Sequence, residues 1–109
     1  MGMDPSWFKL DRPMIIAVSY GALFFMFPPM RNDMIKLACV IRNYNERSVL
    51  FDLLACDLIS DQEPLPLPPQ VWIERQEITV IEYIETEDLP LLVGWKMTFP
   101  LLAELLKEA

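Results

Sequence analysis

Carboxylate side chains are the most numerous groups in this chain that could do chemistry. Two carboxylates with different pKa values can act as general acid and general base. On a strand, however, Glu82 and Glu85 would point to opposite faces, and carboxylates beside turns are usually solvated. The sequence therefore predicts no catalytic pair among the ten carboxylates between residues 52 and 88, which are Asp52, Asp57, Asp61, Glu63, Glu74, Glu77, Glu82, Glu85, Glu87 and Asp88.

Other catalytic groups are scarce. The chain has no histidine, so it lacks the usual general base and the commonest metal ligand. Two cysteines, Cys39 and Cys56, are too few for an all-thiolate cluster, and sixteen residues separate them, unlike a Cys-x-x-Cys redox motif. The stretch 57–63 lacks the glycine of a calcium loop, and no glycine-rich phosphate loop occurs. We expect no enzyme, no cofactor and no metal site.

The charge of the chain is unevenly distributed. Residues 1–55 carry six basic and five acidic side chains, whereas residues 56–109 carry three basic and eleven acidic ones, a net charge of −8. The phosphate backbone of a nucleic acid would be repelled by the second half, and the first half has no run of basic residues. This pattern argues against nucleic-acid binding. It is compatible with a solvated surface or with a basic protein partner.

Two segments alternate between apolar and polar residues, as strands do. If Arg42 faces Ser48 across a polar turn at 43–47, the strands pair Ile41 with Val49, and both turn their apolar rows to one side. The same register pairs Cys39 with Phe51 and Leu37 with Leu53. The apolar rows are Ile35, Leu37, Cys39 and Ile41, then Val49, Phe51, Leu53 and Ala55.

This predicted register has consequences for the cysteines and for Asp52. Cys56 would lie opposite Met34 and on the other face from Cys39, so the two sulfurs could not bond within this hairpin without a bulge. Two buried free thiols indicate a reducing, cytoplasmic compartment. Asp52 would share a face with Lys36, which predicts a diagonal ion pair.

The apolar segment 14–27 is too short for a membrane-spanning helix, which needs about 20 residues. Gly21 favours a turn after Tyr20, so the segment predicts a hairpin of strands 14–19 and 22–27. Residues 1–13 are expected to form an N-terminal arm. Their first six residues formally match a myristoylation pattern, but no basic second anchor follows, and Met1-Gly2 could equally be an addition ahead of Met3.

Residues 60–70 are rich in proline and predict a stiff connector, because proline cannot donate hydrogen bonds to a sheet. Pro66 and Pro69 have the PxxP spacing of an SH3 ligand, but no lysine or arginine flanks them. The connector is therefore the favoured interpretation of this stretch.

The C-terminal part predicts further strands and one helix. Residues 71–85 favour two strands around a turn or wet bend at 74–77, although a helix competes, and 89–97 suggests a last strand. Thr98 is a plausible N-cap and Pro100 suits a first helical turn, so 98–109 predicts a helix with one leucine stripe. We expect this helix to dock on its own sheet rather than on a partner.

The sequence thus predicts a single domain, 1–109, that is mainly β: a small antiparallel barrel, roll or sandwich of five to seven strands with a short C-terminal helix. By elimination, the expected function is protein interaction or assembly, with a protein partner or a second copy of the chain. One alternative is an acidic inhibitor in the basic groove of a nucleic-acid enzyme. Another is a barrel that holds an apolar ligand between Phe24, Phe25, Phe51 and Trp72. The candidate interaction residues are Glu82, Glu85, Glu87, Asp88, Trp95, Leu102 and Leu106.

Overall fold

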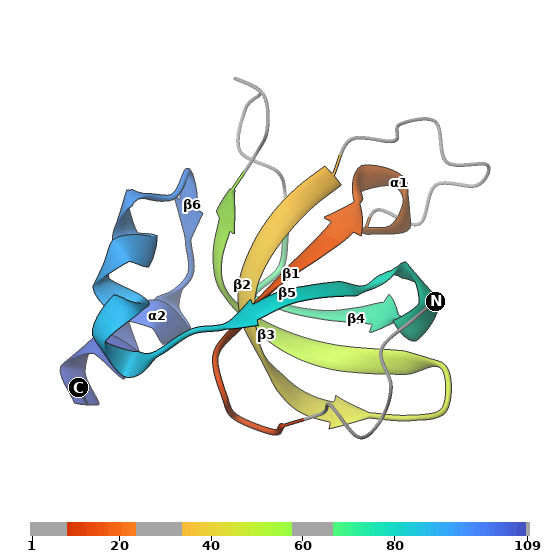
Figure 1. Ribbon diagram of the computed structural model, residues 1–109, viewed down its shortest axis with the longest axis horizontal. Coiled ribbons are helices and arrows are strands. Elements are labelled where there is room, and N and C mark those ends of the chain that lie inside the picture. Colours follow the sequence, from red (N-terminus) through yellow and green to blue (C-terminus); the bar gives the residue numbers. More distant parts are fainter. Residues whose placement is uncertain (1–8, 24–33, 58–66, 109) are drawn as a thin grey trace.

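The computed structural model describes residues 9–23, 34–57 and 67–108 (Figure 1). They form a mainly antiparallel sheet followed by a short C-terminal helix, as predicted. The six strands are β1 (Met14–Ser19), β2 (Met34–Tyr44), β3 (Ser48–Asp57), β4 (Gln70–Glu74), β5 (Thr79–Tyr83) and β6 (Met97–Thr98). The helices are α1 (Tyr20–Leu23) and α2 (Pro100–Glu108), with 3₁₀ helices η2 (Arg75–Glu77) and η3 (Thr86–Gly94).

The sheet has the strand order β4-β3-β2-β1-β5, and β6 pairs separately with β3. Every pairing between these strands is antiparallel. β1 lies between β2 and β5, so that Met14 faces Cys39 on one side and Tyr83 on the other. The strands cross one another at an angle in Figure 1, so the sheet is strongly curved rather than flat.

The β2–β3 hairpin forms, but the predicted register is wrong. Ile41 pairs with Phe51 instead of Val49, because β2 continues to Tyr44 and the turn closes between Asn45 and Ser48. The Asn45 side-chain oxygen accepts hydrogen bonds from the backbone N–H groups of Arg47 and Ser48, both at 2.8 Å, which makes the turn tight. Because the shift at this point is two residues, the apolar rows still face the same side.

The position of Cys56 is a second correction. Cys39 pairs with Leu53, but Ala38 pairs with Ala55, so Leu54 is an extra residue in β3 and reverses the alternation after it. Cys56 therefore joins Cys39 in the same core cluster, while Ala55 turns to the opposite face. Both thiols are buried and free.

Two apolar clusters lie on the two faces of the sheet. The inner core fills the face bounded by β1 to β4 and is formed by side chains such as Met14, Phe51 and Leu53, all fully buried. The cap core lies between the other face of β2 and β3 and the segments η3 and α2. Its buried members are Ala38, Val40, Leu54, Ala55, Ile84, Leu89, Leu92 and Leu102. The C-terminal helix therefore docks on its own sheet.

A cluster of charged and polar side chains, here called the Arg42 cluster, occupies another part of this outer surface. Arg42 is bonded to Asp11 and donates from Nε to Asp52 Oδ2 at 2.6 Å, and Gln70 donates to Asp52 Oδ1 at 2.7 Å. The predicted partner of Asp52 is thus wrong, because Lys36 lies opposite Asp57, four pairs further along the hairpin. The bond to Asp52 raises the pKa of Arg42 above its ordinary value.

Three local predictions are corrected along the chain. Residues 20–23 form one helical turn, in which the Ser19 hydroxyl accepts a hydrogen bond from Ala22 N–H at 3.2 Å, instead of a hairpin turn. Residues 86–94 are a 3₁₀ helix rather than a strand, and only the two residues of β6 follow as a strand. Thr98 pairs with Ala55, so it does not cap α2, which begins at Pro100.

Other predictions hold, or fall outside the described residues. The bend at 74–77 is a turn, since η2 separates β4 from β5. Of the N-terminal arm, residues 9–13 are described, and Leu10 forms a bridge with Ile41 of β2. The second half of the predicted 14–27 hairpin, most of the proline-rich connector and the myristoylation pattern lie outside the described ranges.

Candidate interaction site

The structure places the predicted interaction residues in two different settings. The four carboxylates lie along the segment 82–88, here called the acidic segment, and all four are exposed. Trp95, just after η3, is half-buried. Leu102 is buried in the cap core, and Leu106 packs against that core, so both leucines hold α2 in place.

The geometry of η3 decides which of its apolar side chains reach the surface. In a 3₁₀ helix, residues three apart lie on the same side. Leu89 and Leu92 have this spacing, and both are buried in the cap core. Leu91 and Val93 lie on the remaining surface and are 71% and 59% exposed. Hydrogen bonds fix both ends of η3: Asp88 N–H donates to Glu85 O at 2.9 Å, and Trp95 N–H donates to Leu92 O at 3.0 Å.

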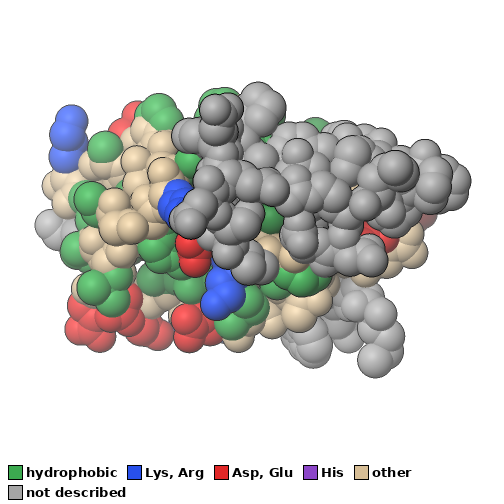
Figure 2. All heavy atoms as spheres, turned by 90° about the horizontal axis from the view of Figure 1, so that it is seen from above, with side chains coloured by type: hydrophobic (Ala, Val, Ile, Leu, Met, Phe, Trp, Pro, Cys, Tyr) green, Lys and Arg blue, Asp and Glu red, His purple; other side chains and the backbone are tan. Residues whose placement is uncertain are grey.

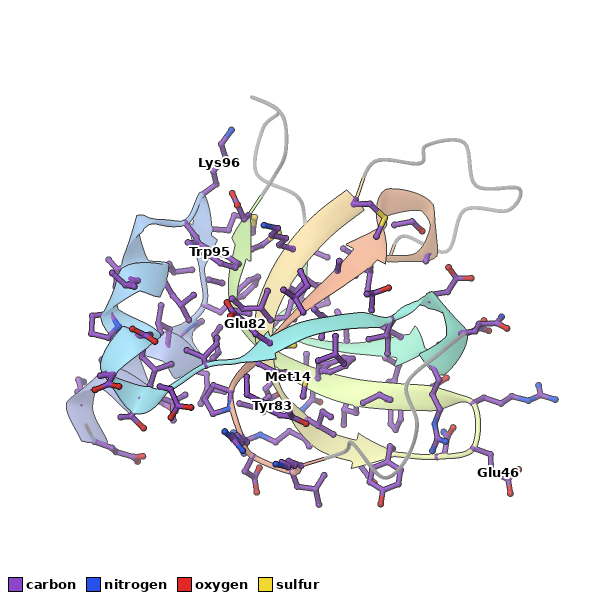
Figure 3. All side chains as sticks on the ribbon, in the orientation of Figure 1. Met14, Glu46, Glu82, Tyr83, Trp95 and Lys96 are labelled. Atoms are coloured by element: carbon purple, nitrogen blue, oxygen red, sulfur yellow. The ribbon has the colours of Figure 1, made fainter. Side chains whose placement is uncertain are left out.

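A hollow of about 270 Å³ separates the end of β5 from η3 and is here called the β5–η3 groove. Its lining combines six apolar or aromatic residues with two carboxylates, Glu82 and Asp88. Glu82 and Trp95 come from opposite sides of the groove, and Figure 3 shows them on neighbouring elements at the same end of the molecule. The lining residues are Ile15, Glu82, Tyr83, Ile84, Asp88, Leu91, Leu92 and Trp95.

The chain segment that forms most of this groove carries charge of one sign. From Gln76 to Trp95 the chain carries five carboxylates and no lysine or arginine. Within the described part of the chain, neither Glu82 nor Asp88 forms an ion pair, while Glu85 meets Arg12 at 3.8 Å on the surface. Figure 2 shows acidic and hydrophobic side chains next to each other at the η3 and α2 end.

The N-terminal residues 9–13 support one wall of the groove. Asp11 N–H donates to Ile41 O at 3.0 Å, and Ile84 N–H donates to Pro13 O at 2.9 Å, so this segment is bonded to β2 and to the end of β5. It places Arg12 4.5 Å from the centre of the Tyr83 ring. Lys9 lies 5.2 Å from the same ring centre, so two cations stack on Tyr83, one of the residues that line the groove.

A second hollow, of about 330 Å³, is less suited to recognition. The described residues of its lining are all polar or charged and carry both charge signs. It lies between the β2–β3 turn and η2, at the end of the molecule where Figure 3 labels Glu46. The lining residues are Glu46, Arg47, Glu74, Arg75 and Gln76.

Of the four side chains considered for an apolar ligand cavity, the two that the structure describes do not come together. Phe51 is fully buried in the inner core, whereas Trp72 is 43% exposed. They follow opposite faces of the sheet, because Phe51 pairs with Val71 and Trp72 pairs with Leu50. Phe24 and Phe25 lie outside the described residues.

The buried thiols are poorly placed for reaction. Burial raises the pKa of Cys39 well above its ordinary value, and burial, together with the charge of Asp57, raises the pKa of Cys56 to about 11. The thiolate, which is the nucleophile, is therefore scarce at neutral pH. Among the residues placed by the structure, no group of three or more acidic or cysteine side chains could hold a metal ion.

Five of the groove residues were not predicted from the sequence: Ile15, Tyr83, Ile84, Leu91 and Leu92. None of the helices in the described ranges has both the length and the apolar character needed to cross a bilayer. Comparison of the chain with protein families, with curated proteins and with solved structures found no match. The case for a function therefore depends on the geometry of the groove.

Proposed function

We propose that this protein is a non-enzymatic interaction subunit that contacts a protein partner through the β5–η3 groove and the acidic segment. The observation that carries the proposal is one hollow that combines apolar side chains with two carboxylates that have no ion pair within the described residues. The apolar surface is stabilised when a partner removes it from water, and the carboxylates favour a partner of opposite charge.

The exposed side chains of η3 support this choice of surface. Leu91 and Val93 are the most exposed large apolar residues of the described chain, and they lie two positions apart beside the acidic segment. Exposed apolar residues with a polar rim are typical of protein interaction sites. The cap core holds η3 from below, so this surface is presented by a packed element.

Site-specific photo-crosslinking tests the proposal. A photoreactive amino acid replaces Leu91 in one variant and Glu104, exposed on α2, in a second, and each is irradiated in a lysate of the source cells. We expect a discrete protein adduct at position 91 and none at position 104. Addition of Glu82→Gln and Asp88→Asn to the first variant should reduce the adduct. Equal labelling at both positions, or no protein adduct at 91, would contradict the proposal.

The acidic-inhibitor alternative is favoured by one observation, the four exposed carboxylates within the seven residues of the acidic segment. A protein that occupies a nucleic-acid site through such a surface competes with the nucleic acid, and its binding weakens steeply with salt. The two functions are separated by adding duplex DNA or RNA to the crosslinking reaction. Loss of the adduct at position 91 would support inhibition, and an unchanged adduct would support an interaction subunit of another kind.

A further inference from the structure

We infer that the β5–η3 groove accepts one long cationic side chain, a lysine or an arginine, from a basic segment of the partner. This inference rests on the proposed function and names the chemistry that the partner brings. Lysine and arginine combine an aliphatic stem with a charged end, and such side chains bury the stem while the charged end stays near water or a counter-charge. The groove offers both environments within one hollow.

The size of the groove suits a single side chain. Its volume of about 270 Å³ lies below the range of about 300–1,000 Å³ that is usual for sites of drug-sized ligands and cofactors. Ile15, Leu91 and Leu92 provide apolar surface for the methylene groups of the stem. A short polar side chain would leave this surface in contact with water, so it would gain less from binding.

The charged groups of the groove select the cation. Glu82 approaches from β5 and Asp88 from η3, so two carboxylates on different elements can meet one positive group. Trp95 adds an indole, the side chain that attracts cations most strongly through its ring face. The next residue, Lys96, points away from Glu82 and Trp95 in Figure 3, so this cation does not fill the groove.

Binding of short peptides to the full chain tests this inference by NMR. The probes are acetyl-Gly-Gly-Arg-Gly-Gly-amide and its lysine counterpart, compared with peptides that carry citrulline or norleucine, which keep the shape of the side chain without its charge. We expect the cationic peptides to shift the Trp95 indole N–H and the Leu91 methyl signals and to leave the Trp72 indole unchanged. The uncharged peptides should give no saturable shift at Trp95.

Matched variants distinguish the groove from general attraction to an acidic protein. Glu82→Gln with Asp88→Asn should raise the Kd of the arginine peptide about tenfold, the effect of losing two exposed ion pairs. Glu46→Gln with Glu104→Gln removes the same charge elsewhere and should leave the Kd unchanged. Leu91→Ser should weaken binding several-fold, whereas Val93→Ser, on the same exposed element, should not. All four positions in the charge variants are exposed, so the fold is retained.

The outcomes separate this inference from the proposed function. Any of three results would overturn the inference. The citrulline and arginine peptides could give equal chemical-shift changes, or the changes could be equal at Trp72 and Trp95. The third is an equal loss of affinity in the two charge variants. If a protein adduct nevertheless forms at position 91, the proposed function stands without it. If the cationic peptides bind as described but no protein adduct forms, the proposed function fails and the groove binds isolated cationic side chains only.

Discussion

The two faces of the sheet differ in how completely their side chains are buried. The inner face carries a single apolar core in which Phe51, Leu53 and Cys56 are all fully buried. The outer face is divided among the cap core, the Arg42 cluster and the β5–η3 groove. The inner face therefore stabilises the fold, and the outer face is where a surface remains available to a partner.

The carboxylates of the outer face also differ from one another. In the Arg42 cluster, Asp52 is 22% exposed as a side chain and is bonded by both Arg42 and Gln70. At the groove, Glu82 and Asp88 are exposed and have no ion pair among the described residues. Acidic residues in a chain of net charge −7 are thus not equivalent, and those of the groove are set apart by the apolar side chains beside them.

Truncation of the two cores should give the largest losses of stability. Phe51→Ala, in the inner core, should lower the free energy of unfolding by about 3–5 kcal/mol, and Leu102→Ala, in the cap core, by about 2–5 kcal/mol. Val93→Ala, at a site that is 59% exposed, should change it by less than about 0.5 kcal/mol. Urea unfolding measures all three. If Leu102→Ala resembled Val93→Ala, the cap core would not support η3 as described.

Ionisation of the buried thiols should destabilise the protein at high pH. The pKa of Cys56 is raised to about 11 in the folded chain, while a free cysteine titrates near pH 8.5. Between these values the unfolded chain loses the thiol proton and the folded chain keeps it, so the free energy of unfolding falls as pH rises. The loss should reach roughly 1–3 kcal/mol near pH 11, since one pKa unit corresponds to about 1.4 kcal/mol.

The matched variant for this pH effect is Cys56→Ala, whose free energy of unfolding should fall less steeply between pH 9 and 11. Urea unfolding at each pH provides the measurement. Equal slopes for both proteins would show that the Cys56 thiol is not shielded in the inner core.

Loss of the Arg42 cluster should have a moderate effect. Arg42→Ala leaves Asp52 with Gln70 alone and releases Asp11, which should lower the free energy of unfolding by about 1 kcal/mol. Arg47→Ala, an exposed arginine in the β2–β3 turn, is the control and should have little effect. Thermal unfolding at low and high salt compares them. If Arg47→Ala lowered the free energy of unfolding as much as Arg42→Ala, the Arg42 cluster would not contribute more to stability than an ordinary exposed arginine.

Neutralising the groove should have the smallest effect on stability. Glu82→Gln with Asp88→Asn removes no ion pair of the described chain and relieves repulsion in the acidic segment, so the free energy of unfolding should stay within about 0.5 kcal/mol or rise slightly. Urea unfolding beside the Arg42→Ala variant makes the comparison. A loss of more than about 1 kcal/mol would mean that these carboxylates are structural.

The sequence was informative wherever one local rule decided the structure. The alternation around Phe51 predicted the central hairpin, and the leucine spacing after Pro100 predicted α2. The register was missed because side-chain alternation does not show where a turn closes, which here is at Asn45. The face of Cys56 was missed because alternation does not reveal an extra residue such as Leu54, which exchanges the faces of Ala55 and Cys56.

The groove was predicted only in part, for a similar reason. The density of carboxylates in the acidic segment indicated Glu82 and Asp88 directly. The apolar walls depend on residues 86–94 forming a 3₁₀ helix, whereas their composition suggested a strand. Only the three-residue spacing of Leu89 and Leu92 could have signalled that Leu91 is left at the surface.

The most direct test of the central claim is the ratio of two Kd values for the arginine peptide. One is measured with Glu82→Gln and Asp88→Asn, the other with Glu46→Gln and Glu104→Gln, which have the same net charge. A ratio of about ten is expected if the unpaired carboxylates of the groove hold the cation. A ratio of one would show that only the overall charge of the protein attracts the peptide.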